Sequence, residues 1–70
     1  MKENFIIIFD IPRKMNTLRN RVHRKLVKFD VKKVQDSAWS SQNIALLSEI
    51  ATEIKKEGAS AQVFKIERIE

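Results

Sequence analysis

Apolar residues recur along this chain with two different periods. The run Phe5-Ile6-Ile7-Ile8-Phe9 is continuous, β-branched and aromatic, which predicts a central strand that ends near Asp10 or Ile11 and is covered on both faces. From Asn16 the spacing changes to three and four residues, which predicts a helix with Asn16 as its N-cap. The apolar face of this helix consists of Met15, Leu18, Val22, Leu26 and Phe29.

The middle of the chain predicts a second strand region and a second helix. Residues 31–42 mix β-branched, aromatic and small polar residues, so they form either two short strands with a turn at Asp36-Ser37 or one kinked strand. A helical pattern follows, with Ser41 or Asn43 as its N-cap and Gly58 as its C-terminal cap. Its apolar members are Ile44, Leu47, Ile50, Ala51 and Ile54.

Residues 61–66 predict the last strand, with Phe64 and Ile66 on one face and Val63 on the other. The order strand, helix, strand, strand, helix, strand is that of the ferredoxin-like α+β fold, in which both helices cover one face of an antiparallel sheet. Residues 1–70 then form one domain. The other sheet face stays bare, so we expect a homodimer through it, and its interface residues are Ile6, Ile8 and Trp39.

Length and composition support association of two copies. Chains of 70 residues usually need a disulfide, a metal or oligomerisation to reinforce a small core. There is no cysteine and His23 is the only histidine, which excludes a disulfide framework and a Cys/His zinc site. The apolar run at residues 5–9 is far too short for a membrane span or a signal peptide. We therefore expect a cytoplasmic homodimer that does not enter a membrane.

Charge is concentrated in the first half of the chain. Fourteen Lys and Arg against nine Asp and Glu give a formal net charge of +5, and between positions 13 and 33 the only acid is Asp30. Helical projection places five cations in one row beside the apolar face of the first helix, and we call this row the basic stripe: Lys14, Arg21, Arg24, Lys25 and Lys28. Arg19 and His23 lie on the opposite flank.

The basic stripe has one sign of charge and no acidic partner within its helix, which favours binding to nucleic-acid phosphates over a merely solvated surface. The second helix carries an acidic row at four-residue spacing, Glu49, Glu53 and Glu57. Like charges at this spacing repel one another, so the row either has a basic partner or, as is commoner, faces solvent. The predicted binding residues are those of the basic stripe, and Arg19, which stands apart from the stripe, is counted with them.

Asp10 is the residue that differs most from its surroundings, because it ends an apolar strand beside Pro12. Catalytic and metal-binding groups often occupy strand ends, although a plain turn residue is the commoner use of Asp there. One carboxylate does not hold Mg²⁺ for a nuclease, but two copies of Asp10 across a dimer axis would. Trp39 either stacks on a base or, more commonly for a strand aromatic, packs in the core. A classical hydrolase is disfavoured, because no phosphate loop or nucleophile elbow is present.

Three segments resemble the family of CRISPR-associated protein two: Phe9-Asp10-Ile11-Pro12, Leu18-Arg19 with Val22 and Leu26, and Val34-Gln35-Asp36-Ser37-Ala38-Trp39. The resemblance implies a ferredoxin-like homodimer that holds foreign duplex DNA for spacer integration together with the CRISPR integrase, protein one. By position, Asp10 matches the family's paired interface aspartate, Arg19 its helix arginine and Trp39 its strand aromatic. Some members are described as metal-dependent endonucleases, which makes a Mg²⁺-dependent nuclease of RNA or DNA the alternative function.

The integrase docking mode stays open, since family members often continue into a tail that crosses to the partner subunit. The Asp-Ile-Pro and Gln-Asp-Ser-Ala-Trp segments are also similar to the related domain of phenylacetate-type transcriptional repressors. Small toxin ribonucleases have a similar fold. An interaction module of one of these types is the third interpretation.

Overall fold

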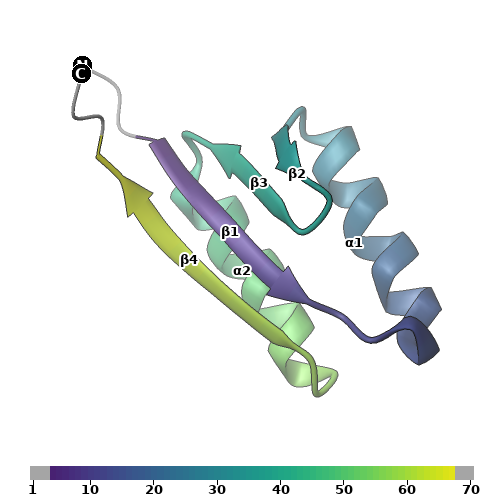
Figure 1. The fold of residues 1–70 in the computed structure, drawn as a ribbon. Helices are drawn as coiled ribbons and strands as arrows, with labels where there is room; N and C mark the ends of the chain where they lie inside the picture. Colours follow the sequence, from purple (N-terminus) through teal and green to yellow (C-terminus); the bar gives the residue numbers. More distant parts are fainter. Residues whose placement is uncertain (1–3, 68–70) are drawn as a thin grey trace.

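The computed structural model describes residues 4–67, which form one antiparallel sheet and two helices (Figure 1). The strands lie in the order β2-β3-β1-β4, and both helices lie behind the same face of the sheet. This is the predicted α+β architecture of the ferredoxin-like type. The elements in chain order are β1 Asn4–Asp10, the 3₁₀ turn η1 Arg13–Met15, α1 Asn16–Lys28, β2 Lys32–Gln35, β3 Ala38–Ser41, α2 Ile44–Lys56 and β4 Ser60–Ile66.

Alternation along β1 separates a core face from an open face. Ile7 is completely buried and pairs in register with Trp39 of β3 and Val63 of β4, so these three side chains share the face that the helices cover. The helices close this core with the residues whose periodicity predicted it, namely Leu18, Val22, Leu26, Leu47, Ile50, Ala51 and Ile54. The helical patterns therefore located the core correctly, apart from the residues at the helix ends.

Both ends of α1 differ from the prediction. Asn16 is the first helical residue and not the N-cap, and the Met15 cap position makes no side-chain hydrogen bond. At the other end the helix stops at Lys28, and Asp30 adopts a left-handed conformation with φ of 58° that leads the chain into β2. Phe29 lies beyond the last helical residue, so it leaves the apolar face to which the projection assigned it, and it is 52% exposed.

Residues 31–42 form a hairpin and not one kinked strand, with the turn at Asp36-Ser37 as predicted. The pairing of β2 with β3 shifts register between Lys33 and Gln35. Lys33 Nζ reaches Asp36 Oδ1 at 3.0 Å across the turn, and Trp39 Nε1 donates a hydrogen bond to the Asp36 carbonyl at 3.2 Å.

The caps of α2 agree with the sequence. The Asn43 side chain accepts a hydrogen bond from the Leu46 backbone N–H at 3.1 Å, which makes Asn43 the N-cap. Gly58 follows the C-cap with φ of 92°, a conformation that glycine adopts without the steric cost of a Cβ. Ile44, assigned to the apolar face, is exposed in the first turn.

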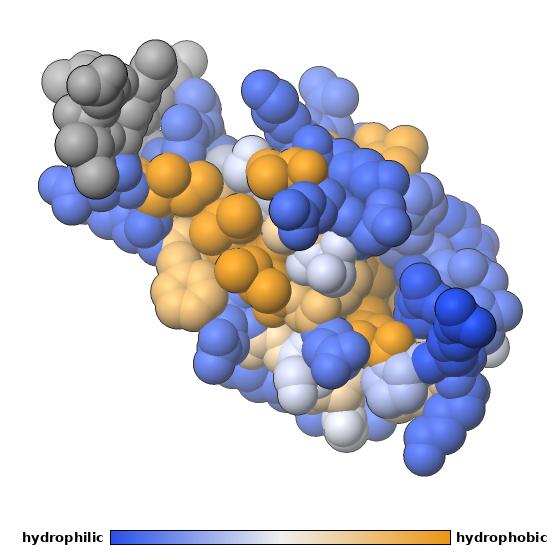
Figure 2. Space-filling model, viewed as in Figure 1, coloured by the Kyte–Doolittle hydropathy of each residue, from blue (hydrophilic) through white to orange (hydrophobic). Residues whose placement is uncertain are grey.

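One face of the sheet carries apolar side chains that no described residue covers, and we call it the open sheet face. Ile6, Ile8, Phe64 and Ile66 alternate with the core residues, and the last three are 39–46% exposed. Figure 2 shows this face as an apolar area surrounded by hydrophilic residues. The bare face expected from the sequence is thus present. Neither helix within residues 4–67 has the length and apolar character needed to cross a bilayer.

Candidate nucleic-acid interface

The basic stripe on α1 is divided by contacts with α2. Arg21 and Lys25, which we call the inner pair, lie on the flank of α1 that faces α2. Arg21 Nε and Lys25 Nζ each contact a carboxylate oxygen of Glu53 at 2.6 Å. Arg21 Nη2 also reaches Glu57 Oε2 at 3.1 Å. These four side chains therefore form one network of ion pairs between the helices.

The network shifts the pKa of two of its members, Glu53 and Arg21. The hydrogen bond from Lys25 lowers the pKa of Glu53, the bond from Arg21 adds to this effect, and partial burial opposes it. The bond to Glu53 is also the largest cause that raises the pKa of Arg21. Glu53 is consequently ionised at neutral pH, and the positive charges of the inner pair are neutralised by ion pairs within the protein.

Two sequence-based expectations are corrected here. The acidic row does not simply face solvent, because the Glu53 side chain is only 21% exposed and lies against α1. The basic stripe does not lack acidic partners, because two of its five members have them. The projection of each helix identified its flanks correctly, but it contains no information on which flanks face each other. That follows from packing both helices side by side on one sheet face.

The remaining stripe members, Lys14, Arg24 and Lys28, form what we call the outer row. All three are exposed, and none makes an ion pair with another residue in the range 4–67. Arg24 and Lys28 are one turn apart on the outer side of α1, and Lys14 belongs to η1 just before the helix. Lys28 Nζ also lies 5.6 Å from the ring centroid of Phe29. These cations remain available to an external anion.

Arg19 lies on the other flank of α1, as predicted, and belongs to a different surface. It lines a hollow at the end of β1 with Asp10, Asp36 and Ser37. The charge of Arg19 lowers the pKa of Asp36, after the larger effect of the hydrogen bond and charge of Lys33. Arg19 thus faces acidic neighbours, and the structure does not bring it together with the outer row.

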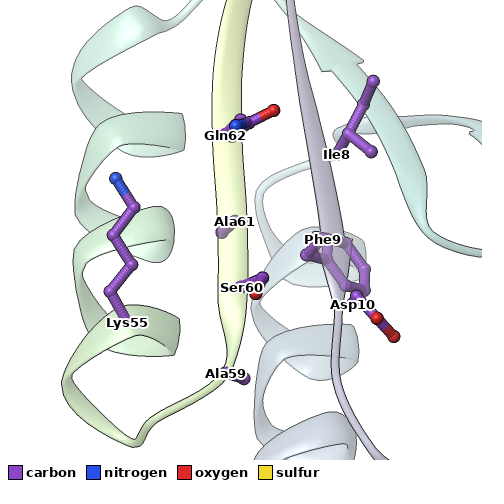
Figure 3. Close-up of a pocket in the computed structure, with 8 residues that line it drawn as sticks. All are labelled: Ile8, Phe9, Asp10, Lys55, Ala59, Ser60, Ala61 and Gln62. Atoms are coloured by element: carbon purple, nitrogen blue, oxygen red, sulfur yellow. The ribbon is translucent and has the colours of Figure 1, made fainter.

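Asp10 is the last residue of β1 and is exposed, opposite Ser60 of β4 in the sheet register. Figure 3 shows Asp10, Ser60 and Gln62 on these two neighbouring strands, with Lys55 on α2. Residues 4–67 contain no group of three or more His, Asp or Glu placed to hold a metal ion. The nearby Arg19 also disfavours a cation.

Trp39 is a core residue and not an interface residue. It is 4% exposed and lies on the helix face of the sheet, where the ring of His23 meets it edge-on at 5.6 Å between centroids. The assignment of Trp39 to a dimer interface on the open sheet face is therefore wrong, and so is base stacking. Ile6 and Ile8 do lie on that face, and Ile8 is 44% exposed.

Sequence reasoning missed the polar flank of α1 beside the hairpin. A second hollow is lined by Asn16, Arg19, Asn20 and His23 from α1, with Asp36 and Trp39 opposite. The signal was available, because these four helix positions are spaced by three and four residues. The contribution of Asp36 could not be predicted from the sequence, since it depends on where the hairpin turn lies relative to α1.

Comparisons with known proteins give no match to this chain among family models, curated proteins or solved structures.

Proposed function

We propose that this protein binds nucleic acid, with duplex DNA as the preferred form, through the outer row on α1. The observation that carries the proposal is the division of the basic stripe. The inner pair forms ion pairs with acidic residues of α2, whereas Arg24 and Lys28 are exposed and make no ion pair among the described residues. On a molecule with a formal net charge of +5, exposed cations in a row attract the phosphates of a nucleic-acid backbone.

We further propose that the binding unit is a homodimer whose second copy covers the open sheet face. That face has an apolar centre, which suits packing against an identical apolar surface. The small core of a 70-residue chain gives a second reason. Two copies would present two outer rows, so one DNA duplex would contact both subunits.

The family resemblance supplies the biological setting of this proposal. A small basic homodimer with the aromatic-Asp strand end and the Val-Gln-x-Ser strand resembles the scaffold protein of CRISPR spacer acquisition. In that role the dimer holds foreign DNA in the cytoplasm while the CRISPR integrase inserts it. The direct check is co-purification with an integrase encoded beside it. If the two proteins did not form a complex in the presence of duplex DNA, that result would argue against the scaffold role.

The DNA-binding proposal is tested by fluorescence anisotropy on a labelled duplex over a salt series. Wild type should lose affinity steeply with salt, with a log–log slope of about −0.9 for each phosphate contacted. The variant Arg24→Ala/Lys28→Ala should bind about tenfold more weakly, with a slope reduced by about two phosphate contacts. The matched control Lys55→Ala/Lys56→Ala removes the same charge from exposed positions on α2.

Equal losses in the two variants would show that only net charge matters, and the outer row would not be the binding site. A flat salt response of wild type would remove the proposal altogether.

The homodimer is tested by sedimentation velocity. Wild type should sediment as a dimer, and Ile8→Ser should shift it to monomer because the change places a hydroxyl at the centre of the open sheet face. Val27→Ser is the control, since Val27 is a 58% exposed apolar residue on α1. A monomeric wild type, or dissociation by Val27→Ser alone, would contradict the assignment of the interface.

The second candidate function is a Mg²⁺-dependent endonuclease that uses Asp10 from two subunits. It is favoured by one observation, that Asp10 has the same parity on β1 as Ile6 and Ile8 and ends the strand beside the open sheet face. A dimer through that face would bring two Asp10 carboxylates to one interface. Asp10→Asn should then abolish Mg²⁺-dependent cleavage of RNA and DNA, whereas Asp36→Asn should not. Equal cleavage by wild type and Asp10→Asn would eliminate this function.

A further inference from the structure

The end of the sheet opposite Asp10 contains a hollow of about 430 Å³ with an unusual lining. It lies where α1 ends, β1 and β2 begin, and β3 leads into α2. One wall is Phe29, and the remaining lining residues carry amide, hydroxyl or charged groups: Asn4, Asp30, Lys32, Ser40, Ser41, Gln42 and Asn43. This combination of an aromatic ring with amide and hydroxyl groups separates the hollow from the apolar patch on the open sheet face.

Several of these polar groups are not engaged within the protein. The side chain of Asn43 caps α2, and Ser41 Oγ accepts a hydrogen bond from the Asn43 backbone N–H at 3.0 Å. The side chains of Asn4, Ser40 and Gln42 make no hydrogen bond to another residue of the described chain. Their donors and acceptors therefore face a ligand or water.

Phe29 is the feature that points to a ligand with a flat ring. Phe5 and Phe9 pack against the core, whereas Phe29 is 52% exposed at the rim of the hollow. Lys28 lies over its ring at 5.6 Å, and Lys32 lines the hollow. An exposed aromatic ring with cations nearby is typical of sites that stack an unpaired base and contact its phosphates.

We infer that this hollow accepts an unpaired nucleobase at the end of a bound nucleic-acid strand. The base would stack on Phe29, the amides of Asn4 and Gln42 would meet its edge, and Lys32 would contact the adjacent phosphate. The inference rests on the proposed function, because Lys28 belongs both to the outer row and to the Phe29 contact. A nucleic-acid backbone that follows Arg24 and Lys28 along α1 would next reach Phe29, the residue after Lys28.

A protein ligand fits the lining less well. An apolar side chain gains by burial against apolar walls, but Phe29 is the only large apolar residue that lines this hollow. A base carries a flat ring and a polar edge, and it uses both kinds of group found here.

The experiment compares a blunt duplex with the same duplex extended by a short single-stranded overhang that contains a fluorescent adenine analogue. Wild type should bind the extended duplex more tightly and quench the analogue by stacking. Phe29→Ala should lower affinity for the extended duplex about tenfold, abolish the quenching and leave the blunt duplex unaffected. Phe29→Trp should retain the preference. Val27→Ala, a change at a neighbouring exposed apolar residue outside the hollow, should leave both affinities unaltered.

The outcomes separate this inference from the proposed function. Salt-sensitive binding to the blunt duplex without a preference for the overhang would overturn the inference alone. A preference that survives Phe29→Ala, or that Val27→Ala removes as well, would also overturn it. Failure of wild type to bind either duplex would overturn the proposed function and the inference together.

Discussion

Two pairs of cations on α1 each consist of one arginine and one lysine, but they have different neighbours. Arg21 and Lys25 are one turn apart, and so are Arg24 and Lys28, three residues further along. The first pair is held by Glu53 and Glu57 between the helices, while the second points outward without an acidic partner among residues 4–67. A rotation of less than one turn about the axis of α1 therefore separates cations that form ion pairs within the protein from cations that are available to a ligand. The role of a basic residue follows from its neighbours, not from its type.

Charge reversal gives the largest expected difference between the two pairs. Arg24→Glu/Lys28→Glu should weaken duplex binding about a hundredfold at low salt while leaving the thermal unfolding transition in place, because neither side chain makes an ion pair within residues 4–67 and the Lys28 contact with Phe29 is exposed. Arg21→Glu/Lys25→Glu should instead lower the unfolding temperature, since it sets like charges against Glu53 and Glu57. Anisotropy and circular dichroism on both variants measure this. Loss of stability in the first variant would show that the outer row also has a structural role.

Removing the shared acid frees Lys25 and leaves Arg21 with Glu57 as its remaining acidic partner. Glu53→Gln should cost about 1 kcal/mol of unfolding free energy, because the ion pairs are only partly shielded from water. The same change should raise duplex affinity severalfold, because it releases Lys25 and removes one negative charge beside Arg21. Urea denaturation and anisotropy report the two effects. Glu49→Gln removes the same charge from a residue without a described ion pair, so equal effects of both variants would refute the distinction.

Acid should act on the same network. The pKa of Glu53 is lower in the folded protein than in the unfolded chain, so its contribution to stability is complete above its ordinary pKa of 4.5 and disappears as pH falls through the lower folded value. Wild type should therefore lose part of its advantage over Glu53→Gln as the pH is lowered below about 4.5. Urea denaturation at a series of acidic pH values tests this, and parallel curves would contradict it.

The smallest effect on stability is expected for the ion pair between Lys33 and Asp36, which is exposed, unlike the network around Glu53. Lys33 and Asp36 lie across the hairpin turn at 3.0 Å, but the Asp36 side chain is 95% exposed. Asp36→Asn should change the unfolding midpoint within experimental error, although the hydrogen bond from Lys33 lowers the pKa of Asp36. Urea denaturation beside Glu53→Gln provides the comparison. A loss as large as that of Glu53→Gln would show that burial does not determine how much these ion pairs stabilise the fold.

The sequence predicted what local chemistry determines. The cap at Asn43, the left-handed Gly58, the hairpin turn and the alternation that buries Ile7 while exposing Ile8 all follow from short-range preferences. The order of elements then limited the topology to the sheet that is present.

The contacts between elements could not be predicted in the same way. Glu53 was assigned to solvent because its partners are 28 and 32 residues away in the chain. Phe29 was assigned to the core because a periodic pattern does not mark the residue at which a helix stops. Core packing was correctly favoured for Trp39, but its inclusion among the interface residues was wrong, because its position opposite Ile7 puts it on the core face. Each error concerns a relation between two elements that only the tertiary structure defines.

The position of β4 at the rim of the sheet has a consequence for handling the protein. β4 pairs with β1 along seven residues in unbroken register, and no described strand pairs with its outer edge. The opposite rim, β2, is short, irregular and carries two lysines, which are features that discourage edge-to-edge aggregation. β4 has none of the irregularity and exposes Phe64 and Ile66. Fibrillar association at high concentration would therefore begin at β4, and a bulge-forming or charged substitution there is the natural way to prevent it.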